Sequence, residues 1–298
     1  MENIDELKHS TSGSPKYRLS NANVFVSSGG YHYIDYLDPV EEISPQIDGS
    51  GLTGDEITYI EKSLQSNPQR VENQVNAVVK HISIKNKKVL DIGCGGGLFL
   101  SKLKEDGAVT TGVELSDTRA HYAQIKHGLD IVKRPIEDDY WQGHHGSFDI
   151  VTLWDVIEHV NYPLSTLKAA ANMLKSGGIL LIDTPCRDAF YHRMGEFTYW
   201  LSRGKYPTFL NTMYSSDQFG HKQILSLAEM REMLVAAGLE VVELRKFHEL
   251  SFPYSFYLKK MFRSDFIVKM ILPVVHILLA LFPIRNKMLA IGRKNNHV

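Results

Sequence analysis

An acidic residue followed by alternating glycines forms the most informative stretch of this chain. Asp91 comes after two apolar residues, and glycines then stand at every second position, Gly93, Gly95 and Gly97, before apolar residues resume. This pattern is typical of a buried strand that passes through a tight turn into a helix, where a ligand can lie against the main chain. Glycine suits the turn because it adopts positive φ and has no Cβ to hold a ligand away. The stretch therefore predicts a cofactor-binding loop.

The spacing of the glycines argues against a dinucleotide cofactor. A dinucleotide-binding loop has the pattern G-x-G-x-x-G, and its last glycine would fall on Leu98 or Leu100 here. A carboxylate at Asp91 would also repel a pyrophosphate, whereas it would attract an ammonium group. We therefore expect a cofactor with a cationic end at this loop.

A second acid stands at the end of the next expected strand, 109–113. Glu114 follows the glycine turn by about 20 residues, which is the distance expected of an acid that binds a ribose. Its carboxylate can accept hydrogen bonds from both ribose hydroxyls. The position of Glu114 therefore supports a cofactor that contains a nucleoside.

Three ionisable residues, Asp155, Glu158 and His159, follow the expected central strand, 148–154. In an open α/β sheet, ligands bind beyond the carboxyl ends of the strands. His159 is a candidate general base, because the unperturbed pKa of histidine, about 6.5, suits proton removal near neutral pH. A structural hydrogen bond to the loop is the alternative role for His159. His221, at the end of a later insertion, is a second candidate base.

These motifs together resemble those of class I S-adenosylmethionine-dependent methyltransferases. Three strings carry the resemblance: D-x-G-x-G-x-G from Asp91, W-D-V-I-E-H-V from Trp154, and L-K-S-G-G-I-L-L-I-D-T-P from Leu174. They are most similar to the small-molecule, quinone-type O-methyltransferases. The resemblance covers the chain from about Val89 to Gly238.

The resemblance implies a Rossmann-like methyltransferase fold that binds S-adenosyl-L-methionine and releases S-adenosyl-L-homocysteine. Asp91 and Glu114 would orient this cofactor, and the glycines would admit it. The loop that follows the third strand would contact adenine, although Pro135 stands where many members of the family have an aspartate, and Asp138 is an alternative contact there. The expected cofactor-binding residues are Asp91, Gly93, Cys94, Gly95, Gly97, Glu114, Leu115, Ile136, Glu137, Trp154 and Asp155, and the expected catalytic residues are His159 and His221.

The elements that must position these residues alternate between strands and helices. Strands are expected at 88–92, 109–113, 130–133, 148–154, 178–183, 239–244 and 287–293. Helices with one apolar face are expected between most of them, for example at 116–127 and 225–237. The alternation predicts an α/β fold with a doubly wound, mostly parallel seven-stranded sheet.

The methyltransferase domain is expected to span 86–298, with an N-terminal helical cover before it. Residues 1–20 lack hydrophobic periodicity and are expected to form a mobile tail. Residues 21–85 combine dense aromatic side chains with two expected helices, 55–64 and 69–82. This cover would either close the substrate side of the site or pack as an ordinary extension.

Two late insertions, 186–223 and 250–284, interrupt the expected domain. The first interleaves basic and aromatic residues, so 187–223 is a candidate acceptor lid and 187–210 a candidate peripheral membrane contact, with an extra packed hairpin or helix as the alternative. The second holds the most apolar stretch of the chain. Segment 252–283 is therefore another candidate membrane contact, with a buried or oligomer-forming helix as the alternative. A transmembrane span is disfavoured because Lys269 and a proline interrupt the roughly 20 apolar residues that it needs.

Composition limits the class of protein. The 298 residues are 43% hydrophobic and 22% charged, which suffices for a substantial core. Lysine and arginine number 33 against 34 acids, so nucleic acid is not an expected partner. Two cysteines exclude a disulfide framework, and the N-terminus lacks an apolar signal core. We expect a cytoplasmic protein, with peripheral contact at the inner membrane face as an option, and the oligomeric state stays open.

Our leading hypothesis is a methyltransferase that methylates a hydroxyl of a small acceptor, with lipid-linked and quinone-like molecules among the candidates. Proximity is expected to supply most of the rate, with proton removal secondary. No metal site is predicted, because the adjacent His144 and His145 lack spaced partners. The alternatives are an N- or C-methyltransferase acting on a sugar or other metabolite, a nicotinamide oxidoreductase, and a non-catalytic cofactor-binding module.

Overall fold

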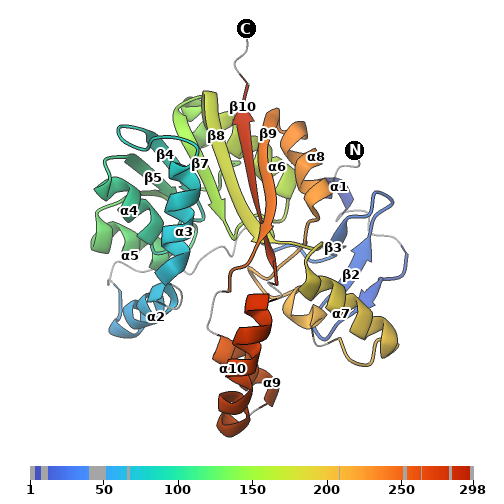
Figure 1. Ribbon diagram of the computed structural model, residues 1–298. Helices are drawn as coiled ribbons and strands as arrows, with labels where there is room; N and C mark the ends of the chain where they lie inside the picture. The colour runs from blue at the N-terminus through green and yellow to red at the C-terminus, as the bar shows by residue number, and fades with distance from the viewer. Residues whose placement is uncertain are drawn as a thin grey trace.

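A seven-stranded sheet runs through the centre of the protein (Figure 1). The computed structural model describes residues 4–7, 13–39, 52–65, 68–207, 209–250, 254–262, 264–281 and 284–295. The strands of the sheet, in spatial order, are β6 (Asp130–Val132), β5 (Val109–Val113), β4 (Lys88–Ile92), β7 (Phe148–Trp154), β8 (Leu174–Pro185), β10 (Lys287–Lys294) and β9 (Leu239–Phe247). Neighbouring strands are parallel except at β10, which pairs antiparallel with both β8 and β9. The predicted doubly wound, mostly parallel sheet is confirmed.

Helices cover both faces of this sheet (Figure 1). One face is packed by α3 (Pro68–Val79), α4 (Leu98–Glu105) and α5 (Asp117–His127). The other is packed by α1 (Ile4–Leu7), α6 (Pro163–Met173) and α8 (Leu227–Ala236). Successive side chains of a strand point to opposite faces, so Val89 joins the first core and Leu90 the second. The strands are buried on both faces, which explains their nearly continuous apolar sequences.

The prediction of a mobile tail is wrong for the parts of 1–20 that the structure describes. Helix α1 packs on α6, and the carboxylate of Asp5 accepts hydrogen bonds from the backbone amides of Leu164 (3.1 Å) and Ser165 (2.8 Å). Asp5 therefore binds the otherwise unpaired amides at the start of α6. Residues 13–20 include β1 (Tyr17–Arg18), whereas 1–3 and 8–12 lie outside the described residues.

The N-terminal cover is two separate structures, and only one of them is helical. The aromatic stretch forms β2 (Asn23–Val26) and β3 (His32–Ile34), and β2 pairs with both β1 and β3 in a small antiparallel sheet. This sheet shares a core with the first insertion, where α7 (Phe190–Leu201) and the 3-10 helix η3 (Leu210–Thr212) lie. The predicted helices are present as α2 (Gly54–Gln65) and α3, and α2 packs against α5 on the far side of the molecule (Figure 1). Residues 40–51 and 66–67 of the cover lie outside the described residues.

The second insertion forms a helical hairpin that projects from one end of the sheet (Figure 1). Helices α9 (Tyr254–Phe262) and α10 (Asp265–Leu281) pack against each other. Within the described residues, no helix combines the length and the apolar character that crossing a membrane requires. Residues 251–253, 263 and 282–283 of this insertion are outside the described part of the chain.

Candidate active site

The glycine loop connects β4 to α4 and leaves one side of its main chain uncovered. Gly93, Gly95 and Gly97 all adopt left-handed backbone angles, with φ of 73°, 56° and 80°. A Cβ at Gly93 would lie 2.6 Å from the side chain of Val156, and one at Gly97 would lie 2.5 Å from that of Leu129. A Cβ at Gly95 would meet no atom within 4 Å. The outer two glycines therefore allow close packing, and Gly95 faces the space in which a ligand can approach the backbone.

Glu114 joins this loop to the end of β5. Its carboxylate accepts hydrogen bonds from the backbone amides of Gly95 and Ser116, both at 2.8 Å, and its side chain is buried. An ionised carboxylate has about four acceptor sites, so two remain for a ligand. Leu115 and Cys94 are half-buried beside this junction. The structure thus brings Glu114 to the glycine loop, as the spacing predicted.

Asp91 lies beneath the loop, inside the sheet. Its carboxyl group accepts a hydrogen bond from Thr152 Oγ1 of β7 at 2.7 Å. Burial, together with the negative charges of Glu114 and Asp183, raises the pKa of Asp91 to about 8. A further cation bound next to Asp91 would favour its ionised form.

Asp155 occupies the turn after β7 in a strained backbone conformation. Its φ is 53°, which is uncommon outside glycine, and its amide donates to the main-chain oxygen (3.1 Å) and to the Oδ1 (2.8 Å) of Asp183. The carboxylate of Asp155 lies 2.6 Å from Arg70 Nη2 and 2.7 Å from Lys287 Nζ. Burial alone would raise the pKa of Asp155, but these two cations hold it well below its usual value.

Lys287 is the centre of a buried charge cluster at the carboxyl ends of β7 and β8. Besides Asp155, its ammonium group pairs with Asp183 at 3.0 Å and Glu249 at 3.3 Å. Burial would lower the pKa of Lys287, but the surrounding carboxylates raise it well above its ordinary value. Lys287 therefore acts as a fixed internal cation of the site.

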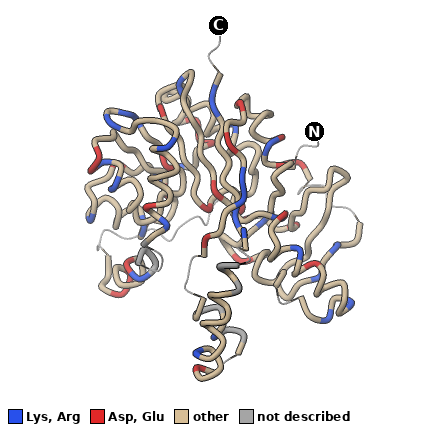
Figure 2. The backbone as a smooth tube through the Cα atoms, in the orientation of Figure 1, with Lys and Arg blue, Asp and Glu red and all other residues tan. Residues whose placement is uncertain are grey.

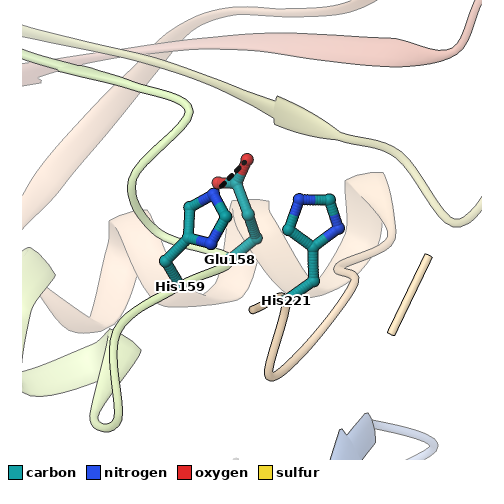
Figure 3. Close-up of side chains that lie close together, drawn as sticks. All are labelled: Glu158, His159 and His221. Carbon is teal, nitrogen blue, oxygen red and sulfur yellow. Dashed lines mark ion pairs between the residues drawn. The ribbon is translucent and has the colours of Figure 1, made fainter. Parts of the chain in front are cut away.

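His159 and His221 lie side by side, although they come from distant segments (Figure 3). Their ring centroids are 4.7 Å apart, and His159 Nε2 lies 3.9 Å from Glu158 Oε1. Burial lowers the pKa of His159, and burial together with the charge of His159 lowers the pKa of His221 to about 4. Both imidazoles are therefore in the base form at neutral pH. His221 Nδ1 lies 3.1 Å from the backbone oxygen of Met213, which commits one of its ring nitrogens.

Glu158 lies next to His159 and His221 and is buried. Thr184 Oγ1 donates to its carboxyl at 2.9 Å, and burial and the charge of Asp155 raise the pKa of Glu158 well above its ordinary value. Donor atoms of Glu158, His159 and His221 lie within 4.8 Å of one another. A single ion could bridge such a spacing, which the sequence did not indicate.

The end of the first insertion is hydrogen-bonded to the loop after β7. The backbone amide of Lys222 donates to the carbonyl oxygen of Glu158 at 2.7 Å. The side chain of Gln223 donates to the carbonyl oxygens of Ile157 (2.6 Å) and Val160 (3.0 Å). These bonds explain why the two candidate bases meet.

Three of the expected cofactor-binding side chains make contacts within the protein. Ile136 is buried in the core beside α6, and Trp154 packs edge-on against Phe99 with ring centroids 5.4 Å apart. Glu137 accepts a hydrogen bond from Thr166 of α6. These contacts are made within the protein, and the expected role of the three residues in cofactor binding stays a prediction. Buried apolar side chains after β6 and β7 are used for packing.

Sequence reasoning missed two functional candidates, Arg70 and Lys287. Arg70 lies in the first turn of α3, which begins at Pro68. The proline at the helix start was the only local feature that could have drawn attention to this turn. Lys287 opens β10, and its place beside β8 depends on an antiparallel pairing that no local pattern indicates.

A family model described as a methyltransferase domain matches residues 63–244, which is more than half of the chain. A ubiquinone biosynthesis O-methyltransferase from Marinobacter nauticus is 31% identical over 181 residues, which are 57% of this chain and 71% of that protein. A protein of the same name from Stutzerimonas stutzeri is 35% identical over 115 residues, 37% of this chain and 50% of that protein. In several such relatives the match thus spans only about half of their length.

Solved structures share the fold at lower identity. A chain of the complex between the Haloferax volcanii Trm112 methyltransferase activator and a methyltransferase has a TM-score of 0.56 and 18% identity, covering 82% of this chain and 98% of that chain. Magnesium protoporphyrin IX methyltransferase from Synechocystis, with bound S-adenosylhomocysteine, has a TM-score of 0.51 and 15% identity, covering 83% of this chain and 90% of that chain. At these identities the likeness shows the architecture alone.

Proposed function

The chain belongs to the methyltransferase domain family, and we propose that it transfers a methyl group from S-adenosylmethionine to a hydroxyl oxygen of a small acceptor. Membership of this family argues against two of the alternative functions, a nicotinamide oxidoreductase and a non-catalytic cofactor-binding module. The names of the aligned relatives favour oxygen as the methylated atom.

The observation that carries the proposal is the junction of Glu114 with Gly95. The 2.8 Å bond between them places a carboxylate next to an uncovered stretch of backbone at the carboxyl ends of β4 and β5. A nucleoside can place its ribose hydroxyls on the free acceptor sites of Glu114 while the rest of the cofactor lies along Gly95. An ionised Asp91 beneath the loop would repel a pyrophosphate, which favours a thioether or sulfonium link next to the ribose.

The methionyl end of the cofactor is then expected between Asp91 and Arg70. Its ammonium group would favour the ionised form of Asp91, and its carboxylate would bind the guanidinium of Arg70, whose planar donors match a carboxylate. Arg70 is near enough to Asp91 that its charge lowers the pKa of that acid. In this arrangement the ammonium group and the carboxylate of the methionyl end each meet a protein side chain of opposite charge.

The acceptor would lie beyond β7, next to His159. Transfer from a sulfonium is a displacement along the line from the acceptor oxygen through the methyl carbon to the sulfur, so orientation supplies most of the rate. His159 would remove the hydroxyl proton, and its neutral imidazole is ready to accept it. A lipid-linked or quinone-like acceptor fits the names of the relatives and the apolar surface near this end of the molecule.

The test is to follow the methyl group itself. The protein is incubated with S-adenosylmethionine carrying a carbon-13 methyl and with phenols, amines, sugars and quinols in separate reactions. Carbon-13 NMR of the product should show the label on oxygen, with one S-adenosylhomocysteine formed for each methyl transferred. A label found only on nitrogen or carbon would contradict the proposal.

A further inference from the structure

Two apolar protrusions flank the end of the molecule at which the candidate active site lies. Helix α7 and the α9–α10 hairpin both project beyond the carboxyl ends of β7 and β8 (Figure 1). They come from different insertions of the chain. We refer to the exposed face of α7 and the exposed face of α10 together as the docking surface.

Helix α10 exposes an apolar stripe. Phe266, Met270, Val274 and Ile277 follow one another at helical spacing, and Phe266 and Met270 are 74% and 64% exposed. At 1.5 Å per residue, the stripe is about 16 Å long. Val268, on the other side of the helix, is buried. The hairpin thus turns apolar side chains outward, which a water-exposed helix does not normally do.

Helix α7 also has apolar side chains on its exposed face. Phe190, Phe197 and Leu201 lie on one exposed face, and Trp200 beside them is 72% exposed. The opposite face buries His192, whose Nε2 lies 3.0 Å from the hydroxyl of Tyr214. The apolar face therefore does not serve the core of this part of the protein.

Basic residues lie near α7 and near the tip of the α9–α10 hairpin (Figure 2). Arg193, Arg203 and Lys205 are exposed in the first insertion, and Lys205 lies over the ring of Tyr206. Lys259 and Lys269 are exposed on the hairpin, where Lys259 pairs with Asp265. Apolar side chains bordered by Lys, Arg, Trp and Tyr are the composition that suits the interface of an anionic bilayer.

We propose that the docking surface seats the protein on an anionic lipid bilayer, with the apolar faces of α7 and α10 inserted among the lipids and the basic residues at the headgroups. The charge pattern favours lipid over a protein partner, because the basic residues border both apolar faces. The hairpin lies beyond the segment, 63–244, that the methyltransferase domain model matches, so the hairpin part of the surface is an addition of this chain to that domain. A protein seated in this way could take its acceptor from the bilayer, and this part of the inference rests on the proposed function. The binding of the docking surface to the bilayer does not rest on it.

Vesicle flotation of the full chain tests the seating. The probes are vesicles of phosphatidylcholine alone and of phosphatidylcholine mixed with phosphatidylglycerol, each at low and high salt. Wild type should float with the anionic vesicles and bind less at high salt, because salt screens the headgroup attraction. The variants Met270→Ser/Val274→Ser and Phe197→Ser/Trp200→Ser should each weaken binding by about 100-fold, since each buried apolar side chain contributes about tenfold.

The matched control is Val235→Ser on α8, because Val235 is as exposed as Ile277, 61% each, and belongs to a helix outside the docking surface. This variant should float like wild type. The proposal is overturned if wild type fails to float, or if both double variants float as well as wild type. It is also overturned if ultracentrifugation shows a dimer that Met270→Ser/Val274→Ser dissociates, because a second copy would then cover the face.

A titration of the same proteins with S-adenosylhomocysteine separates this proposal from the proposed function. Variants that bind the nucleoside normally but no longer float confirm the docking surface independently of catalysis. A wild-type protein that floats but binds no S-adenosylhomocysteine contradicts the proposed function and leaves the docking surface standing.

Discussion

The ammonium group of Lys287 lies 2.7 Å from the carboxylate of Asp155, and this pair connects the last strand of the sheet to the turn after the central one. Burial alone would raise the pKa of Asp155, and Lys287 is the cation that lowers it most. Arg70 holds the second oxygen of the same carboxylate. The turn that leads to Glu158 and His159 is therefore positioned by two cations, of which one is almost completely buried.

We predict that Lys287→Met strongly destabilises the protein. Methionine has a similar length but no charge, so Asp155, Asp183 and Glu249 would lose the cation that they share. Removing one partner of a buried ion pair costs about 3–5 kcal/mol, because the other charge is left uncompensated. The free energy of unfolding, measured with urea, should fall by that amount.

The control for this variant is Lys80→Met. Lys80 pairs with Glu243, but its side chain is largely exposed, so its loss should cost less than about 1 kcal/mol. Equal losses of stability in the two variants would mean that Lys287 is not the organising cation of the cluster.

Glu114→Ala should weaken the binding of S-adenosylhomocysteine by about 10- to 100-fold, the value of one or two hydrogen bonds to a charged group. The change removes the acceptor of both the Gly95 amide and the expected ribose hydroxyls. Calorimetric titration measures the affinity. Glu105→Ala, at an exposed position of the helix that follows the loop, is the control and should bind like wild type. Unchanged affinity in Glu114→Ala would remove this residue from the cofactor site.

The affinity for S-adenosylhomocysteine should rise with pH up to about 8. The pKa of Asp91 is raised to about 8, so at neutral pH its carboxyl must release a proton before it can pair with the ammonium group of the ligand. A ligand that prefers the ionised form binds up to about tenfold more weakly for each pH unit below that pKa. Titrations at pH 6, 7 and 8 should show this slope, and Asp91→Asn should abolish it. A wild-type affinity that is the same at all three pH values would show that Asp91 does not meet the ammonium group.

His159→Ala should lower kcat by about 100-fold and leave KM nearly unchanged, as expected when a general base is removed. His221→Ala should have a smaller effect, because one ring nitrogen of His221 faces the backbone oxygen of Met213. Steady-state rates with an acceptor identified by the labelling experiment measure both. If the rate of His159→Ala equals that of wild type, His159 only supports the loop. If EDTA abolishes wild-type activity, His159 acts through an ion rather than as a base.

His32 and His192 should each lower the free energy of unfolding as the pH drops from about 6.5 to 4, whereas the raised pKa values of the buried acids Asp91 and Glu158 act in the opposite direction. Burial lowers the pKa of His32 to about 2 and that of His192 to about 4. In the unfolded chain both titrate near about 6.5, so below that pH the unfolded state binds protons that the folded state does not. Each of the two histidines then lowers the free energy of unfolding by up to about 1.4 kcal/mol per pH unit. Urea denaturation at pH 7, 6 and 5 should show the slope, and His192→Gln should reduce it, whereas the exposed control His145→Gln should not. If the free energy of unfolding of His192→Gln depends on pH between 7 and 5 as that of wild type does, this account is contradicted.

The sheet could be predicted because its signals are local. The expected strands at 88–92, 109–113 and 148–154 coincide with β4, β5 and β7, since each is a short apolar run that ends at a glycine or an acid. The distance between the glycine loop and Glu114 was also informative, because consecutive parallel strands end at the same edge of the sheet.

The contacts that complete the site could not be predicted in this way. Lys287 reaches Asp155 only because β10 enters between β8 and β9 in the antiparallel direction. His221 meets His159 only because Lys222 and Gln223 pair with the loop after β7. Asp5 was assigned to a tail because its partner, the start of α6, is distant in sequence. Each of these depends on tertiary pairing, which periodicity does not report.

The central claim is that the loop of Gly93, Gly95 and Gly97, joined to Glu114, binds S-adenosylmethionine. It is tested most directly by calorimetric titration of the full chain with S-adenosylmethionine and NADH in parallel. The account predicts saturable binding of S-adenosylmethionine with one site per chain and no binding of NADH. Tight binding of NADH without binding of S-adenosylmethionine would contradict it.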